Sequence, residues 1–427
     1  MTTSHPQDMQ GIEQPKSLHR RSWLKGIGVG AVGLGVGALA AKTYIESNDG
    51  TQTKQEVYGA HQAGIITPQP AAAIIAVFDV LAKDKKGFEK LLRTLTDRIT
   101  FLTEGGQLPQ IDPKFPPLNS GIMGDKVFPD NLTMTVSLGA SVFDGRFGLT
   151  ALKPKHLQDM QPFPNDALEP ESTDGDLSIQ ICSNTAETCI HALRDIIKNT
   201  PDLMTMRWQM DGFLPQHMIR KLGKDTMRNL LGFKDGTSNV DAKNNALLNE
   251  LIWVSDHANS AGEPAWAQGG SYQAVRLIRN RVEFWDRTPL QEQETIMGRH
   301  KISGAPLGKA NEHDDPDFAS DPNGQRIPHD AHIRLANPRT PESRKNLILR
   351  RGYNYSQGLS KSGQLNMGLL FVCYQSNLVN GFLTVQGRMN GESLEEYIKP
   401  FGGGYFFSLP GFAKGEYLGQ PLIQATA

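Results

Sequence analysis

Three polar stretches of the chain hold residue types that could act together on a ligand. The first, residues 231–239, reads LGFKDGTSN and places Asp235 between Gly232 and Gly236. Glycine adopts backbone angles that other residues avoid, and it lets a ligand approach the main chain closely. Such a loop could hold the carboxylate of Asp235 over a flat ligand and move a proton there. The same residues are also common in surface turns, so the loop alone allows both interpretations.

The second stretch, residues 327–339, contains His329 and His332 with arginines close behind them. A zinc site requires three or four ligands, and no cysteine or further histidine lies nearby in the sequence to complete one. Haem iron, in contrast, takes one protein nitrogen on one face and keeps its opposite face open for reaction. Arginines would also suit the anionic propionates of haem. For His332 the alternative is a polar histidine that is simply hydrogen-bonded.

In the third stretch, residues 346–355, a short apolar run is followed by two arginines, of which Arg350 is the first. It predicts either a strand end with solvated guanidinium groups or a fixed cation that projects into a buried site. A haem peroxidase needs an iron ligand, a base that shifts the peroxide proton, and a fixed cation near the charge that forms as the O–O bond breaks. His332, Asp235 and Arg350 are of the right types for these three tasks.

The hydrophobic pattern of the first half predicts a strand–helix–strand–strand–helix–strand unit. Continuous apolar residues predict a buried strand, and alternating ones predict half-buried strands. In chain order the predicted elements are a strand at 73–78, a helix over 88–102, strands at 132–138 and 177–181, a helix over 186–197 and a strand near 204–210. This order is typical of a split βαβ unit.

The second half has a similar pattern, so the chain is expected to hold two copies of one α+β unit. After the Asp235 loop comes an irregular polar region at 299–339. The predicted elements beyond it are a strand at 369–374, a helix near 381–388, a short helix near 393–398 and a glycine-rich ending at 402–410.

Length and composition limit the possible functions. The 427 residues suggest two or three domains. The net charge of −1 gives no sign of a nucleic-acid-binding surface. Cys182, Cys189 and Cys373 fit no metal-site spacing and make no disulfide framework.

The N-terminus resembles a twin-arginine export signal. Residues 17–25 read SLHRRSWLK, an apolar run follows from 26 to 41, and the residues ALA at 38–40 resemble a cleavage site. The pattern predicts a signal at 1–41, a linker at 42–67, and a periplasmic protein that is exported folded and keeps no stable membrane anchor after cleavage. A transmembrane anchor is the alternative, although the apolar run of ~16 residues is shorter than the ~20 that a spanning helix needs.

The chain resembles the dye-decolourising peroxidases, and within them the exported deferrochelatase/peroxidase branch of bacterial iron-uptake systems. The resemblance covers essentially the whole mature chain, from His61 to Gly411. Its most specific marks are GFKDGT at 232–237, AHIR at 331–334 and LRRGY at 349–353, supported by GRHKISG at 298–304 and the ending at 402–410.

This resemblance implies two ferredoxin-like domains, residues 68–217 and 218–420, in a duplicated arrangement like a dimeric α/β-barrel. One haem b per chain would be held mainly by the second domain. Asp235 would be the distal acid/base, Arg350 the distal arginine and His332 the proximal iron ligand, with His329 as the competing candidate.

Further site residues are implied around these three. Gly236, Thr237 and Ser238 would line the distal face, and Asn337, Pro338 and Arg339 would lie against the haem. A carboxylate usually orients a proximal histidine through its other ring nitrogen. Glu396 is the expected carboxylate here, with Glu392 as the alternative.

The implied function is reduction of hydrogen peroxide with oxidation of organic donors, together with release of iron from haem while the porphyrin stays intact. A non-enzymatic periplasmic haem carrier is the alternative, and a carrier would not need Asp235 and Arg350 together. The implied partners are hydrogen peroxide, haem or an organic electron donor, a second copy in a homodimer, and iron-transport components.

Overall fold

The computed structural model describes residues 52–108, 111–215 and 226–425. The predicted export signal at 1–41 lies outside these ranges, as does the first part of the predicted linker. Of the helices within the described ranges, none is long and apolar enough to cross a membrane. The three cysteines are buried and form no disulfide.

The first half folds in the order that its hydrophobic pattern predicts. Each of its two long helices begins after a polar residue whose side chain accepts a hydrogen bond from the first turn, Asp84 from the N–H of Gly87 and Thr185 from the N–H of Thr188. The elements are β1 (Ala72–Val80), α2 (Lys85–Glu104), β4 (Thr133–Gly139), β5 (Leu177–Ser183), α3 (Ala186–Asn199) and β6 (Met204–Phe213), with a small ribbon of β2 (Gly106–Gln107) and β3 (Lys126–Val127) after α2.

The second half has the same alternation with longer insertions. Its strands are β7 (Ser271–Asn280), β8 (Leu349–Arg350), β9 (Tyr353–Leu359), β10 (Leu365–Gln375) and β11 (Ile398–Ser408). Its helices are α5 (Asn245–Leu251), α6 (Val282–Trp285), α7 (Leu290–Met297), α8 (His332–Ala336), α9 (Thr384–Met389) and α10 (Gln420–Gln424). Strand β7 was not predicted, because the buried polar residues Gln273 and Arg276 interrupt its apolar pattern.

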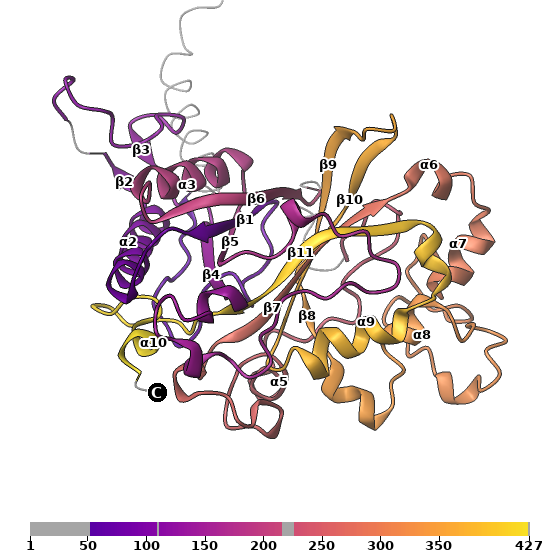
Figure 1. Cartoon of the computed structure of the whole chain (residues 1–427). Helices are drawn as coiled ribbons and strands as arrows, with labels where there is room; N and C mark the ends of the chain where they lie inside the picture. The colour runs from indigo at the N-terminus through magenta and orange to yellow at the C-terminus, as the bar shows by residue number, and fades with distance from the viewer. Residues whose placement is uncertain (1–51, 109–110, 216–225, 426–427) are drawn as a thin grey trace, which may run out of the picture. The chain divides into compact units, whose positions relative to one another are not determined.

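The strands of both halves form one sheet that closes on itself (Figure 1). Its order is β7-β11-β4-β5-β1-β6-β9-β10-β8, and β10 also pairs with β7. The first half contributes β4-β5-β1-β6 and the second half contributes β9-β10-β7-β11. The two sets meet where residues 406–408 of β11 pair with residues 137–139 of β4, and where Phe213 of β6 pairs with Asn354 of β9. The duplicated, barrel-like α+β arrangement is therefore confirmed.

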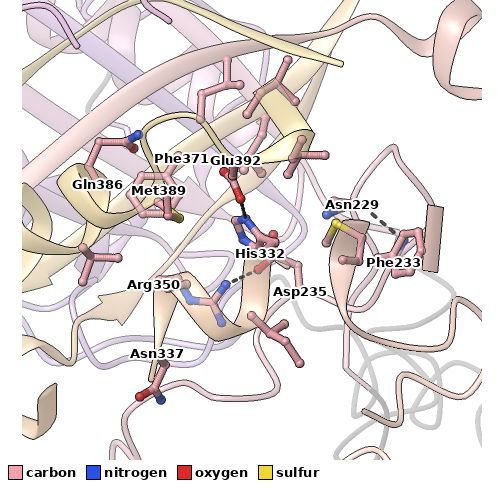
Figure 2. Close-up of a pocket in the computed structure, with 18 of the residues that line it drawn as sticks. Asn229, Phe233, Asp235, His332, Asn337, Arg350, Phe371, Gln386, Met389 and Glu392 are labelled. Carbon is pink, nitrogen blue, oxygen red and sulfur yellow. Dashed lines mark hydrogen bonds and ion pairs between the residues drawn. The ribbon is translucent and has the colours of Figure 1, made fainter. Parts of the chain in front are cut away.

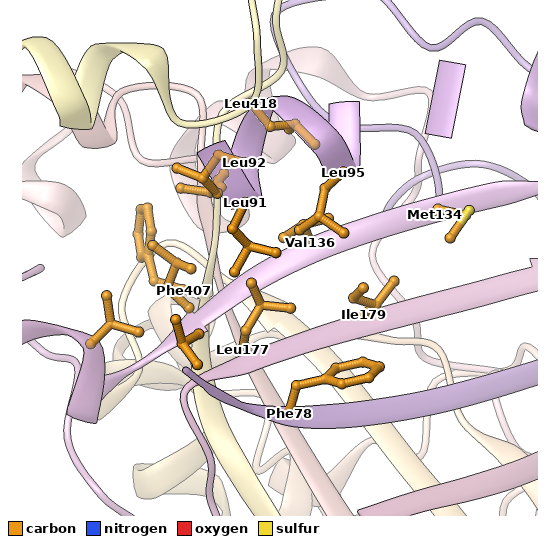
Figure 3. Packing of buried hydrophobic residues seen from close by; sticks show 14 of the residues in the cluster. Phe78, Leu91, Leu92, Leu95, Met134, Val136, Leu177, Ile179, Phe407 and Leu418 are labelled. Carbon is orange, nitrogen blue, oxygen red and sulfur yellow. The ribbon is translucent and has the colours of Figure 1, made fainter. Parts of the chain in front are cut away.

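A hydrophobic core lies between the helix α2 and the strands of the first half (Figure 3). Leu91, Leu92 and Leu95 project from α2 onto Val136 of β4 and Leu177 of β5, and all five are buried. A second core fills the space between the two sets of strands. The first core stabilises the packing of α2 on the first-half strands. The strands of the second half contribute residues to the cavity described below.

We expect Leu95→Ala to lower the free energy of unfolding by about 2–5 kcal/mol, because it leaves a cavity in the first core. Leu81→Ala is the matched control, since it removes the same atoms from a side chain that is 47% exposed. It should change the stability by no more than about 0.5 kcal/mol. Urea unfolding followed by circular dichroism measures both, and equal effects would contradict the assigned core.

Candidate active site

A cavity lies beside the second-half strands and is bounded by α8, α9 and the Asp235 loop (Figure 2). Alternate residues of β7 and β10 face it, as the two-residue period of a strand requires. Its walls are largely apolar and include Leu231, Phe233, Ile278, Ile333, Phe371 and Met389.

Most of the predicted site residues line this one cavity, although they are spread over more than a hundred positions in the chain. Those that line it are Asp235, Gly236, Thr237, Ser238, His332, Asn337, Arg339 and Arg350. Pro338 is not among the lining residues, and neither is His329, which packs against Gly324 instead.

Asp235 and Arg350 form an ion pair at the cavity wall. The distance from Arg350 Nη1 to Asp235 Oδ1 is 2.5 Å, and the two side chains are 28% and 29% exposed. The N–H of Asp235 donates to the carbonyl of Met227 at 2.7 Å. The side chain of Asn239 bonds to both backbone groups of Arg350, each at 2.8 Å. The loop and the strand β8 are thus tied together, which fixes the carboxylate against the guanidinium.

His332 is the first residue of α8, and its Nδ1 lies 2.7 Å from Oε2 of Glu392. Burial alone would lower the pKa of His332, but the adjacent Glu392 carboxylate raises it above its usual value. In the neutral ring, Nδ1–H donates a hydrogen bond to this carboxylate and the lone pair lies on Nε2. Within the described residues, Nε2 has no hydrogen-bond partner, and no group of three His, Cys, Asp or Glu side chains is placed to hold a metal ion.

The prediction of Glu396 as the partner of His332 is wrong, because the structure places Glu392 there. Glu392 precedes the 3₁₀ helix Ser393–Glu396 and is buried, with 3% of its side chain exposed. Successive residues of a 3₁₀ helix are about 120° apart around its axis. Glu396 comes four positions after Glu392, so its side chain points in a different direction from that of Glu392. It lies instead in a surface depression with Glu292 and Tyr397.

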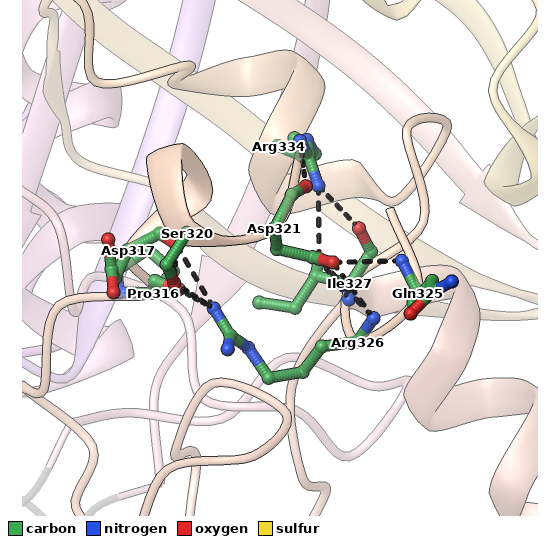
Figure 4. A network of polar contacts seen from close by, with 8 residues as sticks. All are labelled: Pro316, Asp317, Ser320, Asp321, Gln325, Arg326, Ile327 and Arg334. Atoms are coloured by element: carbon green, nitrogen blue, oxygen red, sulfur yellow. Dashed lines mark hydrogen bonds and ion pairs between the residues drawn. The ribbon is translucent and has the colours of Figure 1, made fainter. Parts of the chain in front are cut away.

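A polar network fixes the short helix that carries His332 (Figure 4). Arg334, two residues after His332, donates from Nη1 to the carbonyl of Ile327 at 2.7 Å and from Nη2 to the carbonyl of Asp321 at 2.8 Å. The Asp321 carboxylate accepts hydrogen bonds from three successive backbone N–H groups, residues 325–327. The start of α8 is therefore held although the helix has only five residues.

Two further arginines place positive charge along the cavity. Arg339 is exposed, has a positive φ of 59°, and donates to Oγ of Ser238 at 3.2 Å. Arg299 is only 7% exposed. Burial, with the nearby Arg339 and Arg350, lowers the pKa of Arg299. The cavity thus combines apolar walls with several cations, which suits a flat apolar ligand that carries carboxylates.

Two family models match the chain and divide it between them. The model described as Dyp-type peroxidase, N-terminal, matches residues 62–214, and the model described as Dyp-type peroxidase, C-terminal, matches residues 226–413. The chain belongs to the Dyp-type peroxidase family. All the site residues described above lie within the C-terminal match, while Asn165 and Asp166 of the N-terminal match complete the cavity wall.

Individual relatives agree with this membership. A protein of Yersinia pestis named deferrochelatase is 58% identical over 425 residues, which are 97% of each chain. A deferrochelatase of Escherichia coli O157:H7 is 56% identical over 426 residues, which are 98% of this chain and 99% of the relative. The DyP-type peroxidase from Cellulomonas bogoriensis has a TM-score of 0.77 at 33% identity and covers 88% of this chain and 99% of its own. Ferric DtpA from Streptomyces lividans also has a TM-score of 0.77, at 32% identity, with 88% and 98% covered.

Two structural contributions to this Dyp-type peroxidase site were not predicted from the sequence. They are the bonds of Asn239 to Arg350 and the buried position of Arg299. Asn239 belongs to the stretch 231–239 and Arg299 to the motif at 298–304, so both lie in segments that the sequence analysis had already connected with the site. The contact of Glu392 with His332 is the one that the sequence analysis gives as the alternative to Glu396.

Proposed function

We propose that this Dyp-type peroxidase binds one haem b per chain and reduces hydrogen peroxide while it oxidises organic donors. The proposal rests on the observation that two pairs of interacting side chains line the same cavity. One is the imidazole of His332 backed by Glu392, and the other is the ion pair of Asp235 and Arg350.

The residues present fit a haem group. The apolar walls suit a porphyrin, and Nε2 of His332 would be the nitrogen that holds its iron. Arg339 and Arg299 supply charge for the propionates. When bound, haem supplies an iron that coordinates peroxide and takes up its oxidising equivalents.

The side chains of this chain supply the proton transfer and the charge stabilisation. Asp235 takes the proton from peroxide and returns it to the outer oxygen, as a general base and then a general acid. Arg350 stabilises the negative charge that develops on that oxygen as the O–O bond breaks. Glu392 keeps the His332 ring in one orientation throughout.

An absorption spectrum of the purified protein, before and after one equivalent of peroxide, tests this function. A Soret band that changes on addition of peroxide supports a peroxidase. A Soret band that peroxide leaves unchanged would instead support a haem carrier, and absence of the band after addition of haem would contradict haem binding altogether.

A second activity, release of iron from haem with the porphyrin intact, is supported by relatives. The Yersinia and Escherichia proteins that share 56–58% of their residues with this chain are named deferrochelatase. Incubation of the haem-loaded protein with a reductant, followed by fluorescence of released protoporphyrin, tests the activity. Recovery of free protoporphyrin is the expected result, and intact haem as the only product would contradict it.

We expect Glu392→Gln to weaken haem binding or the reaction with peroxide by roughly 10–100-fold, as outer partners of metal ligands generally do. The amide keeps the size of the side chain and an acceptor for Nδ1 but removes the charge that polarises His332. Glu396→Gln is the matched control and should behave like the wild type. The haem dissociation constant and the iron reduction potential measure the effect; a larger effect of Glu396→Gln would contradict the assigned pair.

We also propose that the chain reaches the periplasm by twin-arginine export, forms a homodimer and works with iron-transport components. The support is the sequence pattern of residues 17–41 and the resemblance to the exported branch. Recovery of a processed chain from the periplasmic fraction and the sedimentation mass of the purified protein test the first two points.

A further inference from the structure

One carboxylate outside the cavity lining, that of Glu312, bonds to the loop on both sides of Asp235. Its Oε2 lies 2.6 Å from Nζ of Lys234, the residue just before Asp235. Its Oε1 accepts a hydrogen bond at 2.9 Å from Oγ1 of Thr237, two residues after Asp235. A single side chain therefore holds both sides of the segment that carries the proposed acid/base.

The same carboxylate reaches the segment that packs against this loop. Oε1 of Glu312 also accepts a hydrogen bond from Oγ1 of Thr226. The N–H of Asp235 bonds to Met227, next to Thr226. A Cβ added to Gly236 would lie 3.4 Å from Cγ2 of Thr226, so residues 226–227 and the Asp235 loop lie close together. Glu312 thus bonds both to the Asp235 loop and to the neighbouring segment at Thr226, and the position of Asp235 depends on both.

Glu312 is itself fixed. Its backbone carbonyl accepts a hydrogen bond from Nη1 of Arg299 at 2.9 Å, and the same Nη1 donates to the carbonyl of Gly304 at 2.6 Å. The Glu312 side chain is 10% exposed. Burial would raise the pKa of Glu312, but the bonds from Lys234 and the two threonines lower it below its usual value. These partners hold the Glu312 carboxylate in its ionised form, and the exposed ring of His313 also lies 3.9 Å from its Oε1.

The charge of Glu312 matters as well as its bonds. Lys234 is adjacent to Asp235 in the chain, and its ammonium group is paired with Glu312. Asp235 is paired with Arg350 at 2.5 Å. Loss of the Glu312 charge would add net positive charge beside Asp235, which favours the ionised carboxylate and weakens it as a base.

We propose that Glu312 is a positioning residue for proton transfer at Asp235, because it anchors the loop on both sides of Asp235 and offsets the charge of Lys234. The inference rests on the proposed peroxidase function. In this role Glu312 contacts neither peroxide nor haem and acts only through the loop.

Glu312→Gln tests the proposal, since the amide keeps the shape and an acceptor oxygen but loses the charge. We expect the rate constant for reaction with peroxide to fall on the order of tenfold or more, because small misplacements of a catalytic group are costly. The acid limb of its pH profile should move to lower pH, and the Soret band should stay. In the haem-free protein, hydrogen exchange should rise in residues 226–238 and not in α8.

Two further variants separate charge from structure. Lys234→Met in the Glu312→Gln background removes both charges, so the acid limb should return toward its wild-type position if the charge offset is the cause. Glu250→Gln is the control, because it removes the charge from an ion pair with Arg344 (3.1 Å), and neither residue lines the cavity. It should leave the peroxide rate and its pH profile unchanged.

The outcomes distinguish this inference from the function on which it rests. A wild-type rate and pH profile in Glu312→Gln would overturn the positioning role. A rise in exchange that is equal in the loop and in α8 would also overturn it, because Glu312 would then support the fold in general. If the wild-type protein itself gives no reaction with peroxide, the proposed function fails instead.

Discussion

Replacing His332 by alanine should abolish haem retention. Of the residues that line the cavity in the described part of the chain, His332 is the only histidine, and its Nε2 has no other partner there. Removal of the imidazole leaves the buried Glu392 without the hydrogen bond that it accepts at 2.7 Å. The measurement is the Soret absorbance of the purified variant after addition of haem, relative to the protein absorbance.

His329→Ala is the matched control for this prediction, since it removes the same ring three residues away. It should retain haem like the wild type, because His329 does not line the cavity. Circular dichroism of both variants shows whether the fold is kept. Loss of haem from His329→Ala, with retention by His332→Ala, would reverse the assignment of the proximal ligand.

Asp235→Asn should slow the reaction with peroxide by roughly 10²–10⁴-fold, because an amide cannot accept the peroxide proton. Arg350→Leu should slow it by roughly 10²–10³-fold, the usual effect of removing one group that stabilises developing charge. Stopped-flow absorbance under excess peroxide measures both rates. The resting Soret band should persist, since neither residue is the proposed iron ligand.

Because the two residues form one ion pair, their effects should not add in the double variant. Asp241→Asn is a control in the same region, because the Asp241 side chain only caps a turn by accepting a hydrogen bond from the N–H of Lys243 at 2.9 Å. Wild-type rates in Asp235→Asn would contradict the role of this carboxylate and leave the cavity as a binding site alone.

The sequence predicts the individual helices and strands better than it predicts the closure of the sheet. Apolar runs and helical spacing are local signals, and they place the six main elements of the first half in the observed order. Closure depends on pairs such as Phe213 with Asn354, which are remote in the chain and carry no local pattern. Strand β7 is buried on both faces and contains Arg276, so its pattern does not alternate.

The site residues also fall into those that a local motif predicts and those that depend on long-range contacts. Asp235, His332 and Arg350 lie in distinctive motifs, and the structure brings all three to one cavity. Glu392 and Glu312 act through side-chain contacts with residues that are 60 and 75–86 positions away. Such contacts depend on where the loops fold back, and that information is absent from the spacing of residues within one motif.

The closed sheet also limits how another protein can attach to this one. An exposed strand edge can pair with a strand of another chain, but in the described residues each strand of the ring has neighbours on both sides. The outer edge of β8 is occupied by the side chain of Asn239. Unpaired backbone remains along the edge of β6 that faces β9, since the two strands pair only at Phe213 and Asn354, and at the far end of the β9–β10 hairpin, where residues 356–359 are exposed. Where the ring is fully paired, a partner is left with the side chains on helices and loops, and backbone pairing with a second chain is confined to such unpaired stretches.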